Sequence, residues 1–515
     1  MQARTPQFDV LAQSSVRPIA WNTRASFDKA FDVDVVFFTL DQSLLDGPDI
    51  LSSLDDNPIT AWDIYAYQPL TDRTISLEVT REETEPYSIV QAYGDVTLNN
   101  YDGYFTPNSG SPIDQYILPR RPFRLGVGFG DEPLQQLVGL SESVPEIDKA
   151  SRTATFHIID FMSFLYDRDI TETVLLQNVT TDEILAYLFG IMGLTSDQYV
   201  LDVGQNVIPF FYTERGDQFG SVVEDLIEAE IGSLYMDELG LIRFKNVYYP
   251  YLNTDIVYSF DKSNIIDYSV SDEQSIINSV KVKADIREVQ TLQSVWSSSQ
   301  VTILAAGAST TVWAELPDPV TSLNEPSFSP SEVQDSFFIS AVDESGEDPS
   351  SDIDLTSFDA FGKSAKMVFT NTGLSTLYLV QINLWGTPAK VTETITASDK
   401  DQESIDKFEE RVYEIDNPYI QTQEMAVTRV ETLLREYKDL GSLIDVEVKG
   451  NSALQISDVV QLDIDGYSGP YVIRREVNIV SEGKFTQRLR LRKTTIYDFF
   501  TLDVSELDGT DVLYV

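Results

Sequence analysis

Short segments in which apolar and polar residues alternate, separated by turns, recur along most of the chain. Near the start they include RTISLEVTR (73–81), SIVQAYGDVTL (88–98) and FRLGVGFG (123–130), and DVDVVFFTL (32–40) has the same character. A period of two places successive side chains on opposite faces of a strand. Strands of this length and spacing are typical of barrels and sandwiches, so the pattern predicts a mainly β protein with some α+β elements.

A chain of 515 residues is too long for one hydrophobic core, so we expect a multidomain protein. Changes in pattern divide it into β strands over 1–150, an α+β segment over 151–291, and a Ser/Thr-rich set of strands over 292–398. Residues 399–515 then hold a helix, a second group of strands and an acidic tail. The third segment is predicted to be an inserted β sandwich.

Two helices are expected in the α+β segment. Thr180 and Glu183 have the spacing of a capping box, and the apolar stripe that follows ends near Gly193. A second stripe begins after residue 216 and is expected to end at Gly232. The segment SLYMDELGLIRFKN (233–246) then reads as a β hairpin.

The formal net charge is −47, from 36 Lys and Arg against 83 Asp and Glu. Binding of nucleic acid through its phosphates needs clustered cations, so this charge argues against it, and it also disfavours anionic membranes. Three uses of the charge remain: solubility, a basic protein partner, or a lumen through which DNA slides without sticking.

Positive support for catalysis is lacking in the sequence. The chain has no cysteine, its one histidine, His157, lies in an alternating segment that predicts a structural role, and no nucleotide-binding, esterase or zinc-protease motif occurs. The acidic stretch 343–359 has the composition of a calcium loop without its frame, so we expect a solvated loop. We predict no catalytic, cofactor or metal residues, and a wall or capsule hydrolase using a carboxylate pair remains the less favoured alternative.

The third segment contains three tryptophans, Trp296, Trp313 and Trp385. Aromatic rings of this kind either pack in a core or stack on sugar rings. A carbohydrate- or receptor-binding role for the insert is therefore an alternative function.

Arginines are concentrated in two places on this acidic chain. We single out eight as candidates for contacts between subunits: Arg120, Arg121, Arg124, Arg474, Arg475, Arg488, Arg490 and Arg492. Cations on strands are also common as charged residues that protect a solvated edge, so both interpretations stay open for the C-terminal group. As a contact surface, they would meet the carboxylates of a neighbouring protein.

Several segments, in a fixed order, resemble a family of phage proteins. TLNNYDGYFTP (97–107) is followed by LPRRPFRL (118–125), and TDEILAYLFGIMGL (181–194), GSLYMDELGLIRFKN (232–246) and a C-terminal stretch from 453 to 493 come later. Together they resemble the phage tail-hub or minor tail protein family, similar to the baseplate hub under the tail tube.

The resemblance implies tube-like β barrels at 1–150 and 399–515, an α+β hub at 151–291, and a galactose-binding-like or immunoglobulin-like insert. It implies a homotrimer whose six barrels match the six-fold tail tube. Implied partners are the tail-tube or distal tail proteins, the spike or fibre proteins of the tip and the tape-measure protein. The genome would pass an acidic channel without specific binding. The protein would be assembled in the host cytoplasm, without a membrane span, and reside in the virion tail tip.

Overall fold

The computed structural model describes residues 1–13, 17–27, 67–83, 89–170, 173–246, 249, 255–270, 276–331, 334–439 and 443–494. The strand expected at 32–40 and the acidic tail after residue 494 lie outside these residues. The described chain is mainly β, with several sheets and a small helical layer, so the predicted fold class is confirmed.

The first group of strands forms what we call the N-terminal sheet. Its order is β1 (Ile19–Ala25), β5 (Pro122–Phe129), β6 (Glu132–Ser141), β8 (Thr153–Ile159), β4 (Ile89–Asn99) and β3 (Thr74–Glu83), with every neighbouring pair antiparallel. The short strands β2 (Gln68–Pro69) and β7 (Glu146–Asp148) add to β1 and β8. Helix α1 (Pro6–Gln13) and the inward Phe side chains of β5 and β8 contribute to one core.

Six further strands form the C-terminal sheet. Their order is β14 (Tyr258–Asp261), β28 (Val459–Ile464), β29 (Tyr467–Ser481), β30 (Lys484–Lys493), β27 (Leu443–Lys449) and β15 (Ile265–Val270). Strands β14 and β15 come from the segment 151–291, yet they pair with strands from the chain's end. This sheet has its own apolar core, and β29 pairs with β3, so the two sheets are continuous.

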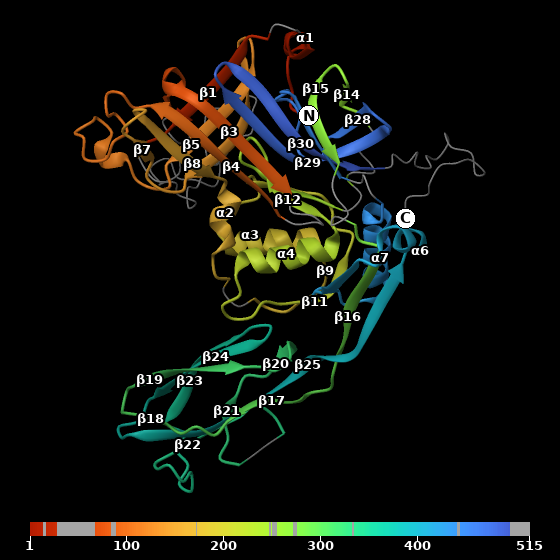
Figure 1. The fold of residues 1–515 in the computed structure, drawn as a ribbon. Helices are drawn as coiled ribbons and strands as arrows, with labels where there is room; N and C mark the ends of the chain where they lie inside the picture. The colour runs from red at the N-terminus through yellow and green to blue at the C-terminus, as the bar shows by residue number, and fades with distance from the viewer. Residues whose placement is uncertain are drawn as a thin grey trace, which may run out of the picture.

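Below the two sheets lies a helical layer, which we call the hub (Figure 1). Its helices are α2 (Phe161–Tyr166), α3 (Thr181–Ile191), α4 (Phe219–Glu230), α6 (Gln402–Phe408) and α7 (Gln423–Tyr437). Its strands are β9 (Leu176–Thr180), β10 (Tyr199–Leu201), β11 (Val207–Phe211), β12 (Ser233–Met236), β13 (Ile242–Lys245), β16 (Ser279–Val289) and β26 (Val412–Asp416). The largest apolar core draws on all of these elements except α6.

Local sequence signals explain most of the hub. The capping box at Thr180 and Glu183 is present at the start of α3, and the predicted hairpin is β12–β13. The expected end of α4 at Gly232 is one residue late, because Ile231 itself adopts the left-handed conformation with φ 62°. Its buried side chain packs in the hub core, which offsets the strain of a β-branched residue there.

The insert expected over 292–398 is a set of strands that hangs below the hub (Figure 1). We use the name insert for residues 292–388, because residues 389–400 of β25 pair with β16 of the hub. One of its two sheets contains β17 (Gln293–Ser298), β18 (Thr302–Leu304), β20 (Val320–Leu323), β21 (Ser327–Phe328), β22 (Phe337–Ala341) and β25 (Leu377–Lys400). The other contains β19 (Ser309–Glu315), β24 (Ser364–Asn371) and β23 (Ile353–Ala360). Both sheets contribute to one core, as expected of a sandwich. The acidic stretch 343–359 is a loop only in its first part, since β23 begins at Ile353.

Candidate interaction surface

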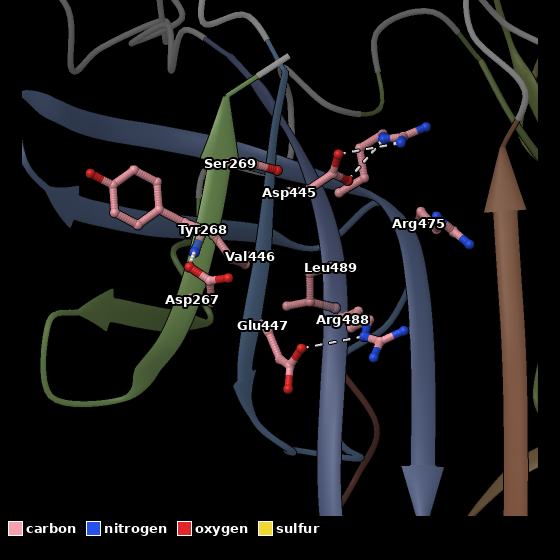
Figure 2. A pocket seen from close by; sticks show the side chains of 10 residues that line it. Asp267, Tyr268, Ser269, Asp445, Val446, Glu447, Arg475, Arg488 and Leu489 are labelled. Atoms are coloured by element: carbon pink, nitrogen blue, oxygen red, sulfur yellow. Dashed lines mark hydrogen bonds and ion pairs between the residues drawn. The ribbon is translucent and has the colours of Figure 1, made fainter.

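A row of opposite charges crosses the outer face of the C-terminal sheet (Figure 2). Strands β27 and β30 are paired so that Asp445 lies opposite Arg490 and Glu447 opposite Arg488. Their neighbours Val446 and Leu489 point into the core, so alternation sends the charged side chains outward. Cross-strand partners on one face are the pairs that interact in an antiparallel sheet.

We call this surface the charged ladder; its members are Glu82, Asp445, Glu447, Arg475, Arg488 and Arg490. Arg490 reaches Asp445 at 3.0 Å and Glu82 at 3.6 Å, and Arg475 reaches Glu82 at 3.5 Å. Arg488 lies 3.4 Å from Glu447. Because Glu82 belongs to β3, the ladder spans the junction of the two sheets.

The ladder faces a shallow hollow whose far wall is the edge strand β15, with Asp267, Tyr268 and Ser269 (Figure 2). Exposed ion pairs of this kind each contribute no more than about 1 kcal/mol to stability. A guanidinium has five N–H donors, so one that touches a carboxylate of its own chain can still donate to an acidic partner. Arg488 is the most exposed of the three arginines, at 63%.

Two candidate arginines of the C-terminal group point inward. Arg474 is 2% exposed and forms a buried ion pair with Glu83, while Arg492 contacts Glu436 at 3.0 Å and the hydroxyl of Tyr437 at 2.9 Å. Arg474 and Arg475 are consecutive on β29 and face different environments, because successive side chains of a strand point to opposite faces. Of the five C-terminal candidates, Arg475, Arg488 and Arg490 are therefore the ones whose side chains reach solvent.

The arginines near residue 120 belong to the N-terminal sheet and are not part of the ladder. Arg120 has φ 63° and lies over the ring of Phe164 at 4.5 Å, and Arg124 lies over Tyr67 at 4.7 Å. Arg121 is only 5% exposed, so its side chain is part of the folded interior. Of the three, Arg120 and Arg124 keep exposed or half-buried surface.

The three tryptophans do not form one platform. Trp296 on β17 packs against the insert core, and Trp385 lies on β25 in the same sheet. Trp313 is on β19 in the other sheet, with the guanidinium of Arg215 over its ring at 4.4 Å and Phe361 stacked at 6.1 Å. That guanidinium covers a ring face that a sugar would need.

Comparisons with known proteins give similar solved structures. The 43 kDa tail protein of prophage MuSo2 from Shewanella oneidensis is 12% identical, with a TM-score of 0.46, over 83% of this chain and 96% of that one. A tail protein from Neisseria meningitidis is 10% identical, with a TM-score of 0.46, over 84% and 94%. A prophage tail protein from Listeria monocytogenes is 11% identical, with a TM-score of 0.42, over 84% and 92%.

All three of these solved structures are described as tail proteins. No family model matches the chain, and no curated protein matches it significantly.

His157 lies on the outer face of the N-terminal sheet, between two carboxylates. Its Nδ1 is 2.6 Å from Asp95 of β4 and its Nε2 is 3.6 Å from Glu146 of β7. Burial alone would lower the pKa of His157, but the hydrogen bond and charge of Asp95 and the charge of Glu146 outweigh it and raise the pKa. The strand expected around His157 is confirmed as β8, and the structural role of this residue stays a prediction.

Sequence reasoning missed a buried polar junction where β3, β29 and the β12–β13 turn meet. Arg81 contacts Glu238 at 2.8 Å and lies 4.0 Å from Glu476, which accepts hydrogen bonds from Asn478 and Gln487. Burial raises the pKa of Glu476 to about 7, against the opposing charge of Arg81. Charged residues at inward positions of otherwise apolar strands were the signal that could have revealed it.

Within the described residues, no group of three or more histidine and carboxylate side chains could hold a metal ion. Over the same part of the chain, no helix has the length and apolar character needed to cross a membrane.

Proposed function

We propose that the chain is a structural, non-enzymatic protein of the phage tail tip, acting as a trimeric hub between the six-fold tail tube and the three-fold tip. The observation that carries this proposal is the pairing of the N-terminal and C-terminal sheets, each with its own core, through β3 and β29. Three copies of such a chain contribute six sheets, which matches the symmetry of a six-fold tube.

The partners follow from this position. Tail-tube or distal tail proteins would bind above the hub and spike or fibre proteins below it, while the tape-measure protein and then the genome pass through its lumen. The charge of −47 supports the last step, because an acidic wall repels a duplex that carries one negative charge per about 1.7 Å of its axis.

Ring formation would use the charged ladder. Its arginines alternate with carboxylates, so a second copy offers complementary charge at the same kind of surface. Arg120 and Arg124 on the N-terminal sheet are the second candidate contact. Arg215 covers one face of the Trp313 ring, so this ring does not support carbohydrate binding through the tryptophans.

Gold-labelled antibodies against the insert test the proposed location on intact virus particles. We expect the label at the tip of the tail, opposite the head. Label along the tail shaft, on the head, or nowhere on the particle would count against the proposal.

A further inference from the structure

The insert and the hub have separate apolar cores. The insert core draws on residues between 295 and 384, and the hub core contains none of them. The two parts are linked through a ribbon in which β16 pairs with residues 389–400 of β25 (Figure 1). At its hub end β26 also pairs with residues 279–283 of β16, so only the part of the ribbon nearer the insert consists of β16 and β25 alone among the described strands. Parts that share no apolar core are held in place by their polar contacts, which are weaker and more easily broken.

The polar contacts gather in one place, which we call the joint: Thr173, Tyr212, Glu214 and Arg215 of the hub with Trp313, Gly362 and Lys363 of the insert. Lys363 forms an ion pair with Glu214, and both side chains keep contact with solvent. Arg215 stacks on Trp313 at 4.4 Å. The backbone N–H of Gly362 donates to the carbonyl of Thr173 at 2.7 Å.

Side chains do not fill the space around the joint. Beside the ion pair lies a cleft with one wall from the hub, Thr213 to Arg215, and another from the insert, Glu315 to Pro317 with Lys363 and Ser364. Solvent reaches the charged contacts from this cleft. Salt and competing ions can therefore weaken them.

Gly362 makes the closest approach between the two parts. A Cβ atom at this position would lie 2.8 Å from Cβ of Tyr212 and 3.1 Å from the carbonyl oxygen of Thr173, and both neighbours belong to the hub. The backbone φ of Gly362 is not in the left-handed region, so alanine would fit the insert's own fold. Position 362 therefore needs glycine for the insert to lie this close to the hub.

The ribbon has a bend where it leaves the hub. The register between β16 and β25 shifts between Ile286 and Arg287, so Thr392 has no partner in the ladder of pairs. A bulge of this kind bends a strand and interrupts its pairing. Arg287, next to the bulge, donates to the hydroxyl of Tyr212 at 3.3 Å and so ties the bend to the joint.

We propose that the joint is a releasable latch that holds the insert against the hub, and that the insert swings on the β16–β25 ribbon when the latch opens. Opening separates Glu214 from Lys363 and uncovers the face of Trp313 that Arg215 occupies. The insert would then reach a wider volume around the hub while staying attached by two strands. The inference does not depend on the tail-tip role.

Distances between two spin labels test the latch, and the absence of native cysteine makes labelling specific. Cysteines replace Leu374 of the insert and Val203 of the hub, which are 100% and 67% exposed. We expect one dominant distance at low salt. Gly362→Ala and Lys363→Glu should each add a second population of different distance, and for Lys363→Glu the undocked fraction should rise about two- to fivefold.

Two controls separate latch opening from general damage. Gly190→Ala makes the same chemical change in α3, where the new Cβ meets nothing within 4 Å, and should leave the distances unchanged. The double variant Glu214→Lys with Lys363→Glu restores opposite charges and should restore the single distance. Wild-type distances in both Gly362→Ala and Lys363→Glu, or several populations already in the wild-type protein at low salt, would overturn the proposal.

Discussion

His157 shows how one surface residue can make stability depend on pH. Its two carboxylate neighbours, Asp95 and Glu146, favour the protonated ring. A group whose pKa is raised by folding binds its proton more tightly in the folded state, so protonation stabilises the fold. That stabilisation is complete below the unfolded-state pKa of about 6.5 and disappears as pH rises through the folded-state value.

Asp95→Asn should therefore lower the melting temperature most at pH 5.5 and progressively less as pH rises above the folded-state pKa of His157. Thermal unfolding of both proteins from pH 5.5 to 9 measures the difference. A difference that is constant over this range would show that the ion pair does not control the effect.

Arginines that look alike in the sequence differ in how exposed their side chains are. Arg121 is buried and Arg488 is exposed, and charge reversal acts differently at the two sites. A buried cation replaced by an anion leaves uncompensated charge in the interior. The sequence grouped Arg474 with Arg475 as contact candidates, and the structure was needed to show that Arg474 lies on the buried side of β29 and Arg475 on the solvated side.

Arg121→Glu should lower the free energy of unfolding by about 3–5 kcal/mol. Arg488→Glu should lower it by less than about 1 kcal/mol, because that side chain is solvated. Urea denaturation of the two variants measures both values, and similar losses would contradict the assigned burial.

Helices and strands were predictable where a local signal decides them. The capping box, the β12–β13 hairpin and the strands of the two sheets follow from patterns within a dozen residues. The pairing of β14 and β15 with strands nearly 200 residues later could not be predicted, because no local pattern encodes it. The end of α4 at Ile231 is likewise set by the hub core rather than by local preference.

Two helical glycines allow a paired test of how closely their helices are packed. Gly220 in α4 faces Tyr166, whose ring atoms would lie 2.5 Å from a new Cβ, whereas Gly190 in α3 faces open space. Gly220→Ala should lower the free energy of unfolding by about 1–3 kcal/mol through overpacking. Gly190→Ala should raise it by up to about 1 kcal/mol, since alanine favours helix.

Denaturant unfolding of the two alanine variants gives the sign of each change. Changes of the same sign in both would contradict the packing of α4 against Tyr166.

The whole molecule combines two sheets, a helical hub and an insert, and only part of this organisation was foreseeable. The mainly β character, the insert and the helices came from composition and periodicity. The joint between insert and hub could not be predicted from the sequence, because Gly362 and Lys363 have no distinctive sequence context. The net charge of the molecule follows from the sequence, but only the structure shows that the charged ladder crosses the β3–β29 junction.

Native mass spectrometry of the purified protein shows whether the chain assembles as a trimer. We expect a species of three times the 57.9 kDa chain mass, and Arg488→Glu should shift it toward the single chain without unfolding it. A wild-type protein that stays a single chain at micromolar concentration, and also fails to bind tail tubes, would contradict a trimeric hub.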